Sequence, residues 1–169
     1  MARRWLPATT NWNCHLPKSN KATTTLMEIR DIEIIGIDID SEVIRKAQRG
    51  LFSKRSIQML PPKILNEYFE KQNEEFYQIA PFLADAIEFK VANVMDKTSM
   101  KSLGKFDAIF SRNMLIYFDD ASKREVCVTF YEMLNQKGWL FLGHADNINR
   151  ATSLFSTVKY GDALIDKKG

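Results

Sequence analysis

The sequence predicts an α/β fold with a Rossmann-like, mostly parallel sheet, and three observations lead to it. Ile32 to Asp38 is an almost continuous run of β-branched apolar residues, typical of a strand buried on both faces of a parallel sheet. A helical pattern over Ser41 to Arg49 follows at once. The same alternation returns where the strand Phe106 to Phe110 precedes an amphipathic helix over Asp120 to Asn135. Strands that alternate with helices favour a parallel sheet with helices on its faces.

Residues 1–31 differ from the remainder, and we interpret them as an irregular leader. Met1 to Thr25 has no acidic residue, no periodic apolar run and two scattered prolines. We expect order to begin near Ile32, and the preceding segment to be either disordered or out of register, as in a frame-disrupted copy. The ordered domain then spans residues 32–169.

Shorter elements are predicted between and after these units. Asp40 is placed to cap the first helix and Gly50 to end it. Leu51 to Leu60 is predicted to be irregular, and Pro61-Pro62 open a helix over 63–71 because proline suits the first helical turn. Residues 63–83 depart from the alternating pattern and are expected to form a small excursion from the main sheet. We further expect a loop or short helix over 95–103, a hairpin over 155–165, and strands over 75–83, 86–94 and 139–142.

The composition argues against several classes of protein. A chain of 169 residues, 45% apolar and 27% charged, fits one domain with a real core. The net charge of +3 is too small and too scattered to indicate nucleic-acid binding. Cys14 and Cys127 have no CxxC spacing and share no ligand pattern with the histidines, so we predict no metal site and a reducing, cytoplasmic location. No apolar run reaches the roughly 18 residues of a membrane span, so no membrane insertion is expected.

Polar residues at two predicted strand ends are the candidate site, because ligands of open α/β sheets bind beyond the carboxyl ends of the strands. Asp38 ends the first predicted strand, where an acid typically binds a ribose hydroxyl. Helix capping is the alternative role, but Asp40 is better placed for it. Arg112 and Asn113 interrupt an apolar stretch directly after the strand that ends at Phe110. None of the seven glycines precedes the strand that ends in Asp38, so the glycine-rich turn that usually accompanies such an acid is missing.

Four blocks of sequence resemble one family in their order and spacing. They are IIGIDIDSEVIRKAQRGLFSKRSIQMLPPKILNEYF, IEFKVANVMD, KFDAIFSRNMLIYFDD and GWLFLGHADN. Together they are similar to the S-adenosylmethionine-dependent methyltransferase domain of the CheR family of chemotaxis receptor methyltransferases. The resemblance covers roughly Ile32 to the C-terminus and is most specific in FSRNMLIYF and LGHADN. It implies a Rossmann-like class I S-adenosylmethionine methyltransferase sheet.

The resemblance also implies a cofactor and a role for each candidate residue. The cofactor is S-adenosylmethionine, with Asp38 on its ribose. The remaining expected cofactor-binding residues are Asn93 and Val94 against the adenine and Arg112 and Asn113 at the strand end. Tyr117, whose family counterpart points its hydroxyl toward the transferred methyl group, is a candidate catalytic residue together with Arg112. Core packing is the alternative role for Tyr117.

The family's reaction is methyl transfer to a glutamate side chain of a chemotaxis receptor, which gives a γ-methyl ester. A glutamate with a pKa near 4.3 is already ionised at neutral pH, so no general base is required. Catalysis is then a matter of positioning and electrostatics. We accordingly expect His144 to be a loop or hydrogen-bonding residue rather than a base. The segment 63–83 matches the place where the family inserts a small subdomain that touches receptors.

The chain departs from the family pattern at its N-terminus, so the resemblance implies a methyltransferase sheet that is N-terminally incomplete. Family members carry a helical domain, then a strand and a glycine-containing motif, before the strand that ends in the acid, and neither is recognisable in Met1 to Thr25. Three functions therefore stay open. They are an active protein-glutamate methyltransferase, a non-catalytic fragment or regulatory docking module of the same family, and a nicotinamide-dependent dehydrogenase.

Overall fold

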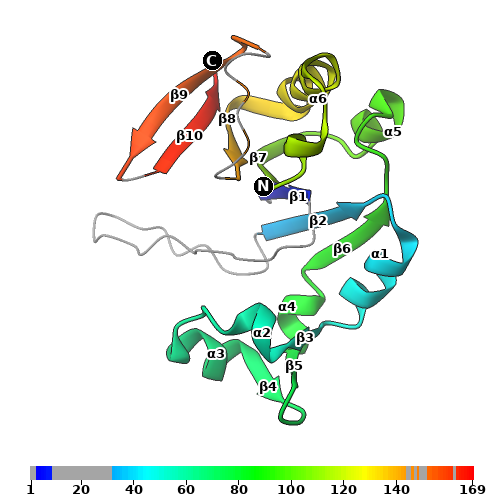
Figure 1. Cartoon of the computed structure of the whole chain (residues 1–169), viewed down its shortest axis with the longest axis vertical. Helices are drawn as coiled ribbons and strands as arrows, with labels where there is room; N and C mark the ends of the chain where they lie inside the picture. Colours follow the sequence, from blue (N-terminus) through cyan, green and yellow to red (C-terminus); the bar gives the residue numbers. More distant parts are fainter. Residues whose placement is uncertain (1–2, 9–31, 144–145, 147, 149–151, 162) are drawn as a thin grey trace.

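A seven-stranded sheet forms the centre of the molecule (Figure 1). The computed structural model describes residues 3–8, 32–143, 146, 148, 152–161 and 163–169. The strands follow the order β6-β2-β1-β7-β8-β10-β9, and the first five of these are mutually parallel. Their bounds are β1 Arg3–Ala8, β2 Ile32–Asp38, β6 Ile87–Val91, β7 Phe106–Ser111, β8 Leu134–Leu142, β9 Phe155–Tyr160 and β10 Ala163–Lys168. The predicted Rossmann-like fold class is confirmed.

The position of β1 corrects the expectation that order begins near Ile32. Arg3–Ala8 is a parallel strand in the middle of the sheet, where Trp5 is in register with both Ile34 of β2 and Ala108 of β7. Its sequence, RRWLPA, lacks the apolar run that marks a buried strand. Backbone pairing on both sides is a tertiary effect that overrides this weak local preference. Residues 9–31 of the expected leader lie outside the described part of the chain.

Helices connect the strands, and carboxylates cap them. Asp40 caps α1 (Ser41–Gln48) by accepting a hydrogen bond from the backbone N–H of Glu42 at 2.8 Å, as predicted. Gly50 follows α1 with a φ of 62°, which suits the predicted helix stop. The helices on the later part of the sheet are α5 (Lys97–Ser102) and α6 (Asp120–Met133). Both supply side chains to one core that also contains Ile35, Ile109 and Leu140 of the sheet.

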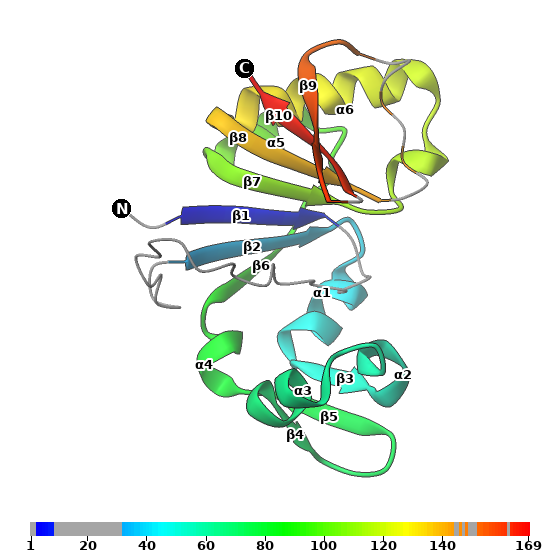
Figure 2. The ribbon, with the colours of Figure 1, turned by 90° about the vertical axis from the view of Figure 1, so that its left-hand side faces the viewer.

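A separate three-stranded antiparallel sheet lies below the edge of the main sheet (Figure 2). Its order is β3-β5-β4, with bounds β3 Leu51–Ser53, β4 Phe69–Lys71 and β5 Phe76–Ile79. Three short helices accompany it: α2 Lys54–Ile57, α3 Pro62–Tyr68 and α4 Pro81–Ala84. This unit lies apart from the main sheet and overlaps the predicted segment 63–83, but its sheet already begins at Leu51, within a stretch that we expected to be irregular. The helix predicted over 63–71 ends at Tyr68, because Phe69 pairs with Ile79 of β5.

The remaining predicted strands are present, but their bounds differ from those expected. The predicted hairpin is formed by β9 and β10, which are antiparallel and occupy the edge of the sheet. The strand predicted over 139–142 is the second half of β8, which begins at Leu134. The strand predicted over 75–83 is shorter, because Pro81 begins α4. Among the described helices, none is both long and apolar enough to cross a membrane.

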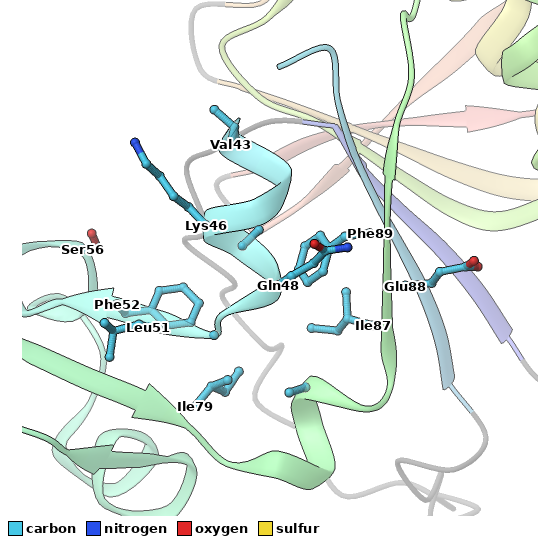
Figure 3. A pocket seen from close by; sticks show the side chains of 13 residues that line it. Val43, Lys46, Gln48, Leu51, Phe52, Ser56, Ile79, Ile87, Glu88 and Phe89 are labelled. Atoms are coloured by element: carbon cyan, nitrogen blue, oxygen red, sulfur yellow. The ribbon is translucent and has the colours of Figure 1, made fainter. Parts of the chain in front are cut away.

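A cavity of about 740 Å³ lies between α1, β6 and the three-stranded sheet (Figure 3). Val43 and Ala47 of α1, Ile87 and Phe89 of β6, and Ile79 form much of its apolar wall. Its lining comes from the later part of α1 and the first residues of β6, whereas the predicted site residues lie beyond the opposite ends of the strands. This cavity is therefore not the site that the sequence predicts.

Candidate cofactor site

Several strands of the main sheet end along one edge, and these ends form the candidate site. Asp38, the last residue of β2, is in register with Val91, the last residue of β6. β1 lies between β2 and β7, and β7 ends at Ser111. Because these strands are parallel, their carboxyl ends face the same side (Figure 2). Asp38 and the residues that follow Ser111 thus lie on one edge, two strand spacings or about 10 Å apart.

The two acids after β2 have separate roles. The carboxylate of Asp38 is half-buried and accepts a hydrogen bond from the backbone N–H of Asp40 at 2.9 Å through Oδ1. Asp40 in turn caps α1. A carboxylate can accept several hydrogen bonds, so Asp38 can also accept one from a ligand hydroxyl. This division of roles removes the helix cap as an explanation for Asp38.

Three exposed apolar side chains, which we call the apolar rim, lie on the same edge as Asp38 and were not predicted from the sequence. Ile39 is 67% exposed directly after Asp38, Val91 is 57% exposed beside it, and Met95 is 38% exposed in the loop after β6. Large apolar side chains gain free energy when a ligand covers them. The sequence did contain one indication of this rim. Ile39 is a large apolar residue between two acids, where helix capping does not require one.

The two residues predicted to meet an adenine differ in their surroundings. Asn93 is exposed in the loop after β6, where its Oδ1 accepts a hydrogen bond from the backbone N–H of Met95 at 3.0 Å. Val94 is partly buried and packs against the hydrophobic core. Both residues follow β6, so the structure brings them to the same edge as Asp38. The Asn93 bond fixes the loop that carries Met95 of the rim.

The end of β7 is held by a buried carboxylate from beyond β8. Arg112 and Asn113 are half-buried, and Asn113 has a φ of 56°, in the left-handed region. The backbone N–H of Asn113 donates to Oδ2 of Asp146 at 2.7 Å. The same oxygen accepts from the backbone N–H of Gly143 at 3.0 Å. Asp146 was not predicted from the sequence, because Asn113, which donates to it, lies 33 residues earlier in the chain.

Tyr117 is accessible rather than part of the core. It ends a short 3-10 helix, Leu115–Tyr117, whose first residue is fully buried, whereas Tyr117 itself is 81% exposed. Core packing is therefore wrong as an alternative for this side chain. The predicted hydrogen-bonding residue His144 lies outside the described part of the chain. Among the described residues, no three His, Cys, Asp or Glu side chains are grouped so that they could hold a metal ion.

The sheet and its edge define a class of protein first. Strand order, parallel pairing and an acid at the end of β2 are those of the Rossmann-like class I methyltransferase fold. The solved N-methyltransferase NodS from Bradyrhizobium japonicum, in complex with S-adenosyl-L-homocysteine, matches with a TM-score of 0.56. The match covers 98% of this chain and 78% of NodS at 12% sequence identity. This likeness shows the fold alone.

The family follows from the sequence comparison. Residues 20–163 match the family described as CheR methyltransferase, SAM binding domain, where SAM is S-adenosylmethionine. The chain therefore belongs to the CheR methyltransferase family, as its four sequence blocks indicated.

Curated relatives support the same assignment. Chemotaxis protein methyltransferase 2 of Vibrio cholerae is 41% identical over 134 residues, which are 79% of this chain and 46% of that relative. A chemotaxis protein methyltransferase of Campylobacter jejuni is 41% identical over 120 residues, 71% of this chain and 45% of the relative. That of Salmonella typhimurium is 33% identical over 127 residues, 73% of this chain and 44% of the relative. The chain spans about half the length of the curated relatives it matches.

The residues at the edge fit the nucleoside part of S-adenosylmethionine. A carboxylate such as that of Asp38 accepts hydrogen bonds from ribose hydroxyls, and the exposed rim of Ile39, Val91 and Met95 offers an apolar surface to an adenine ring. The other end of this cofactor carries an ammonium and a carboxylate, and Arg112 and Asn113 are the polar residues that follow β7 on the same edge. The Asp38 carboxylate, the polar residues after β7 and the apolar rim are thus compatible with S-adenosylmethionine.

Proposed function

We propose that this chain is the S-adenosylmethionine-binding part of a protein-glutamate O-methyltransferase that acts on chemotaxis receptors. The observation that carries the proposal is the shared edge, where Asp38 with its apolar rim lies across β1 from Arg112 and Asn113. Family membership supports the cofactor and the reaction class.

The proposed roles follow the chemistry of each side chain. Asp38 would hold the ribose, Asn93 and Val94 would border the adenine, and Arg112 and Asn113 would hold the polar end of the cofactor. When bound, S-adenosylmethionine supplies an electrophilic methyl group. The acceptor glutamate is ionised at neutral pH, so this chain does not have to remove a proton from it. Its contribution is orientation and charge, with the exposed Tyr117 hydroxyl and the Arg112 guanidinium as the proposed catalytic groups.

The proposal extends to partner and location. The three-stranded sheet, with the predicted segment 63–83, is the proposed contact for a methyl-accepting receptor or a related signalling protein. Phe76 of this sheet, Phe82 of α4 and Met59 after α2 are exposed, which supports a role in protein contact. The proposed location is cytoplasmic, and the free, buried Cys127 is consistent with a reducing compartment.

Calorimetric titration with S-adenosylhomocysteine tests the cofactor site. We expect saturable binding by the wild-type chain and at least about tenfold weaker binding by Asp38→Asn, because the ribose would lose an ionised acceptor. Asp40→Asn is the matched control, since asparagine is an equally good helix cap and this variant should bind like wild type. Equal affinity of both variants and wild type would contradict the role of Asp38.

Transfer of a labelled methyl group from S-adenosylmethionine to receptor glutamates tests the reaction, with the alkali-labile ester as the product. A chain that binds the cofactor but transfers no methyl group would favour the alternative of a regulatory docking module, for which the absence of any glycine before residue 36 is the supporting observation. Binding of NADH instead of S-adenosylhomocysteine would favour the dehydrogenase.

A further inference from the structure

The carboxylate of Asp146 adds hydrogen bonds between the ends of β7 and β8, beyond those of the strand pairing itself. Its Oδ2 accepts hydrogen bonds from the backbone N–H groups of Asn113 at 2.7 Å and of Gly143 at 3.0 Å. Asn113 follows β7 and Gly143 follows β8. We call this arrangement the β7–β8 clamp. Only 9% of Asp146 is exposed, so the clamp is protected from water, and a bond to an ionised acceptor is stronger there than at the surface.

The clamp is closely packed around a missing side chain. A Cβ atom added to Gly143 would lie 2.6 Å from Oδ2 of Asp146, 2.7 Å from Oδ1 of Asn113 and 2.8 Å from the backbone nitrogen of Asn113. Gly143 also donates to the backbone carbonyl of Ser111 at 3.1 Å. The glycine, the asparagine and the aspartate therefore form one unit, in which none can move without displacing another.

The clamp also holds the left-handed backbone of Asn113. Its φ of 56° lies in a region that asparagine adopts more readily than most residues with a side chain. The bond from its N–H to Asp146 fixes this conformation. This turn immediately follows Arg112, so the direction in which Arg112 and Asn113 leave β7 depends on a residue beyond β8.

We propose that Asp146 is a positioning residue for the cofactor site, which it serves by holding the Arg112–Asn113 turn through the β7–β8 clamp. The inference rests on the proposed function, since it assigns Asp146 to the same site. Asp146 itself touches neither cofactor nor substrate in this proposal. Its effect on binding passes through Asn113.

Two variants disrupt the clamp in different ways. Asp146→Ala removes the acceptor, and Gly143→Ala inserts a methyl group where there is no space for one. Both should weaken the binding of S-adenosylhomocysteine by about tenfold or more. Asp146→Asn should be milder, because its amide oxygen can take the place of Oδ2 while its NH₂ takes the place of Oδ1, which is buried and has no partner among the described residues.

Asn73→Ala is the matched control for a loss of backbone contacts alone. The Oδ1 atom of Asn73 also accepts two backbone N–H bonds, from Glu75 and Phe76, both at 2.9 Å, but it does so in the three-stranded sheet. We expect this variant to lower the melting temperature without changing the affinity for S-adenosylhomocysteine. If Asp146→Ala likewise lowers only the melting temperature, Asp146 is a structural residue and the proposal is overturned.

Amide hydrogen exchange separates the failure of this proposal from the failure of the proposed function. Wild type that does not bind S-adenosylhomocysteine overturns the proposed function. The existence of the clamp is then tested by hydrogen exchange at the Asn113 and Gly143 amides, which should exchange slowly in wild type. Faster exchange at these two amides in Asp146→Asn or Asp146→Ala, with β7 unchanged, supports the clamp. Unchanged protection overturns it.

Discussion

The seven-stranded sheet and the three-stranded sheet differ in how much they bury. The main sheet and its helices enclose a core of fully buried side chains, among them Ile35, Phe106, Ile109 and Phe130. In the three-stranded sheet and its helices, over residues 51–84, Ile57 is the one described side chain that is buried. The candidate cofactor site therefore rests on the rigid part of the molecule, whereas the proposed partner contact rests on a part that can adapt.

A pair of phenylalanine truncations gives the largest expected effect and tests this comparison directly. Phe130→Ala in α6 should lower the free energy of unfolding by about 3–5 kcal/mol, because it leaves a cavity in the core. Phe52→Ala in β3 should cost only about 1–2 kcal/mol, since this ring is half-buried and its main contact is an edge-on ring, Phe69, at 5.5 Å. Urea denaturation followed by circular dichroism measures both. Equal losses would mean that the two sheets form one cooperative unit.

Lys168 gives an intermediate effect, because it binds the edge hairpin to the main core. Its ammonium group donates hydrogen bonds to the backbone carbonyls of Tyr131 at 2.8 Å and Leu134 at 2.9 Å, where α6 passes into β8. Lys168→Ala should lower the free energy of unfolding by about 2 kcal/mol. Lys159→Ala, at an exposed position on β9, is the control and should be neutral. A neutral Lys168→Ala would show that the hairpin adds nothing to the core.

Thiol labelling compares solvent access in the main core with solvent access in the three-stranded sheet. Cys127 of α6 is fully buried, and burial, with a smaller contribution from the Asp166 carboxylate, raises its pKa to about 12. In a Cys14→Ser background at pH 8, we expect Cys127 to react only as fast as the main core unfolds. A cysteine at position 76 in the three-stranded sheet (Phe76→Cys), where the native side chain is 36% exposed, should react at once. Rapid labelling of Cys127 would contradict the rigid core.

The direction of the Cys127 pKa shift adds a pH dependence. The thiol has an ordinary pKa of 9.0, so both the folded and the unfolded chain are protonated below that pH. As the pH rises from 9.0 toward about 12, the unfolded chain loses its proton first, and the folded state loses stability. The stability of wild type relative to Cys127→Ala should therefore fall over this range. A difference that does not depend on pH would mean that the thiol is accessible in the folded state.

Local sequence signals predicted the elements that carry them. The buried run of β2, the Asp40 cap and Gly50 stop of α1, and the alternation in β6 were sufficient to define those elements. β1 was missed because its strand character comes from pairing with β2 and β7 on both sides. The first strand of the small sheet was missed because three residues are too few to show a period.

Some residues of the candidate site could likewise be predicted from local sequence, and others could not. Asp38, Arg112 and Asn113 were predicted because strand ends are where polar residues break an apolar run. The packing of Val94 against the core and the exposure of Tyr117 were not predictable, since a strand-end loop can turn either way. Asp146 was also missed, because a carboxylate that binds backbone N–H groups across two strands leaves no spacing in the sequence.

The central place of β1 affects when the candidate site can be completed during folding. β1 pairs with β7 in a register that joins Trp5 to Ala108, about a hundred residues later in the chain, so the edge that carries the candidate site is closed by one of the most distant contacts available. During synthesis, β2 and β6 emerge before β7, so the edge that carries Asp38 and Arg112 is complete only after β7 has paired with β1. We therefore expect the candidate site to form late, after β7 has been synthesised.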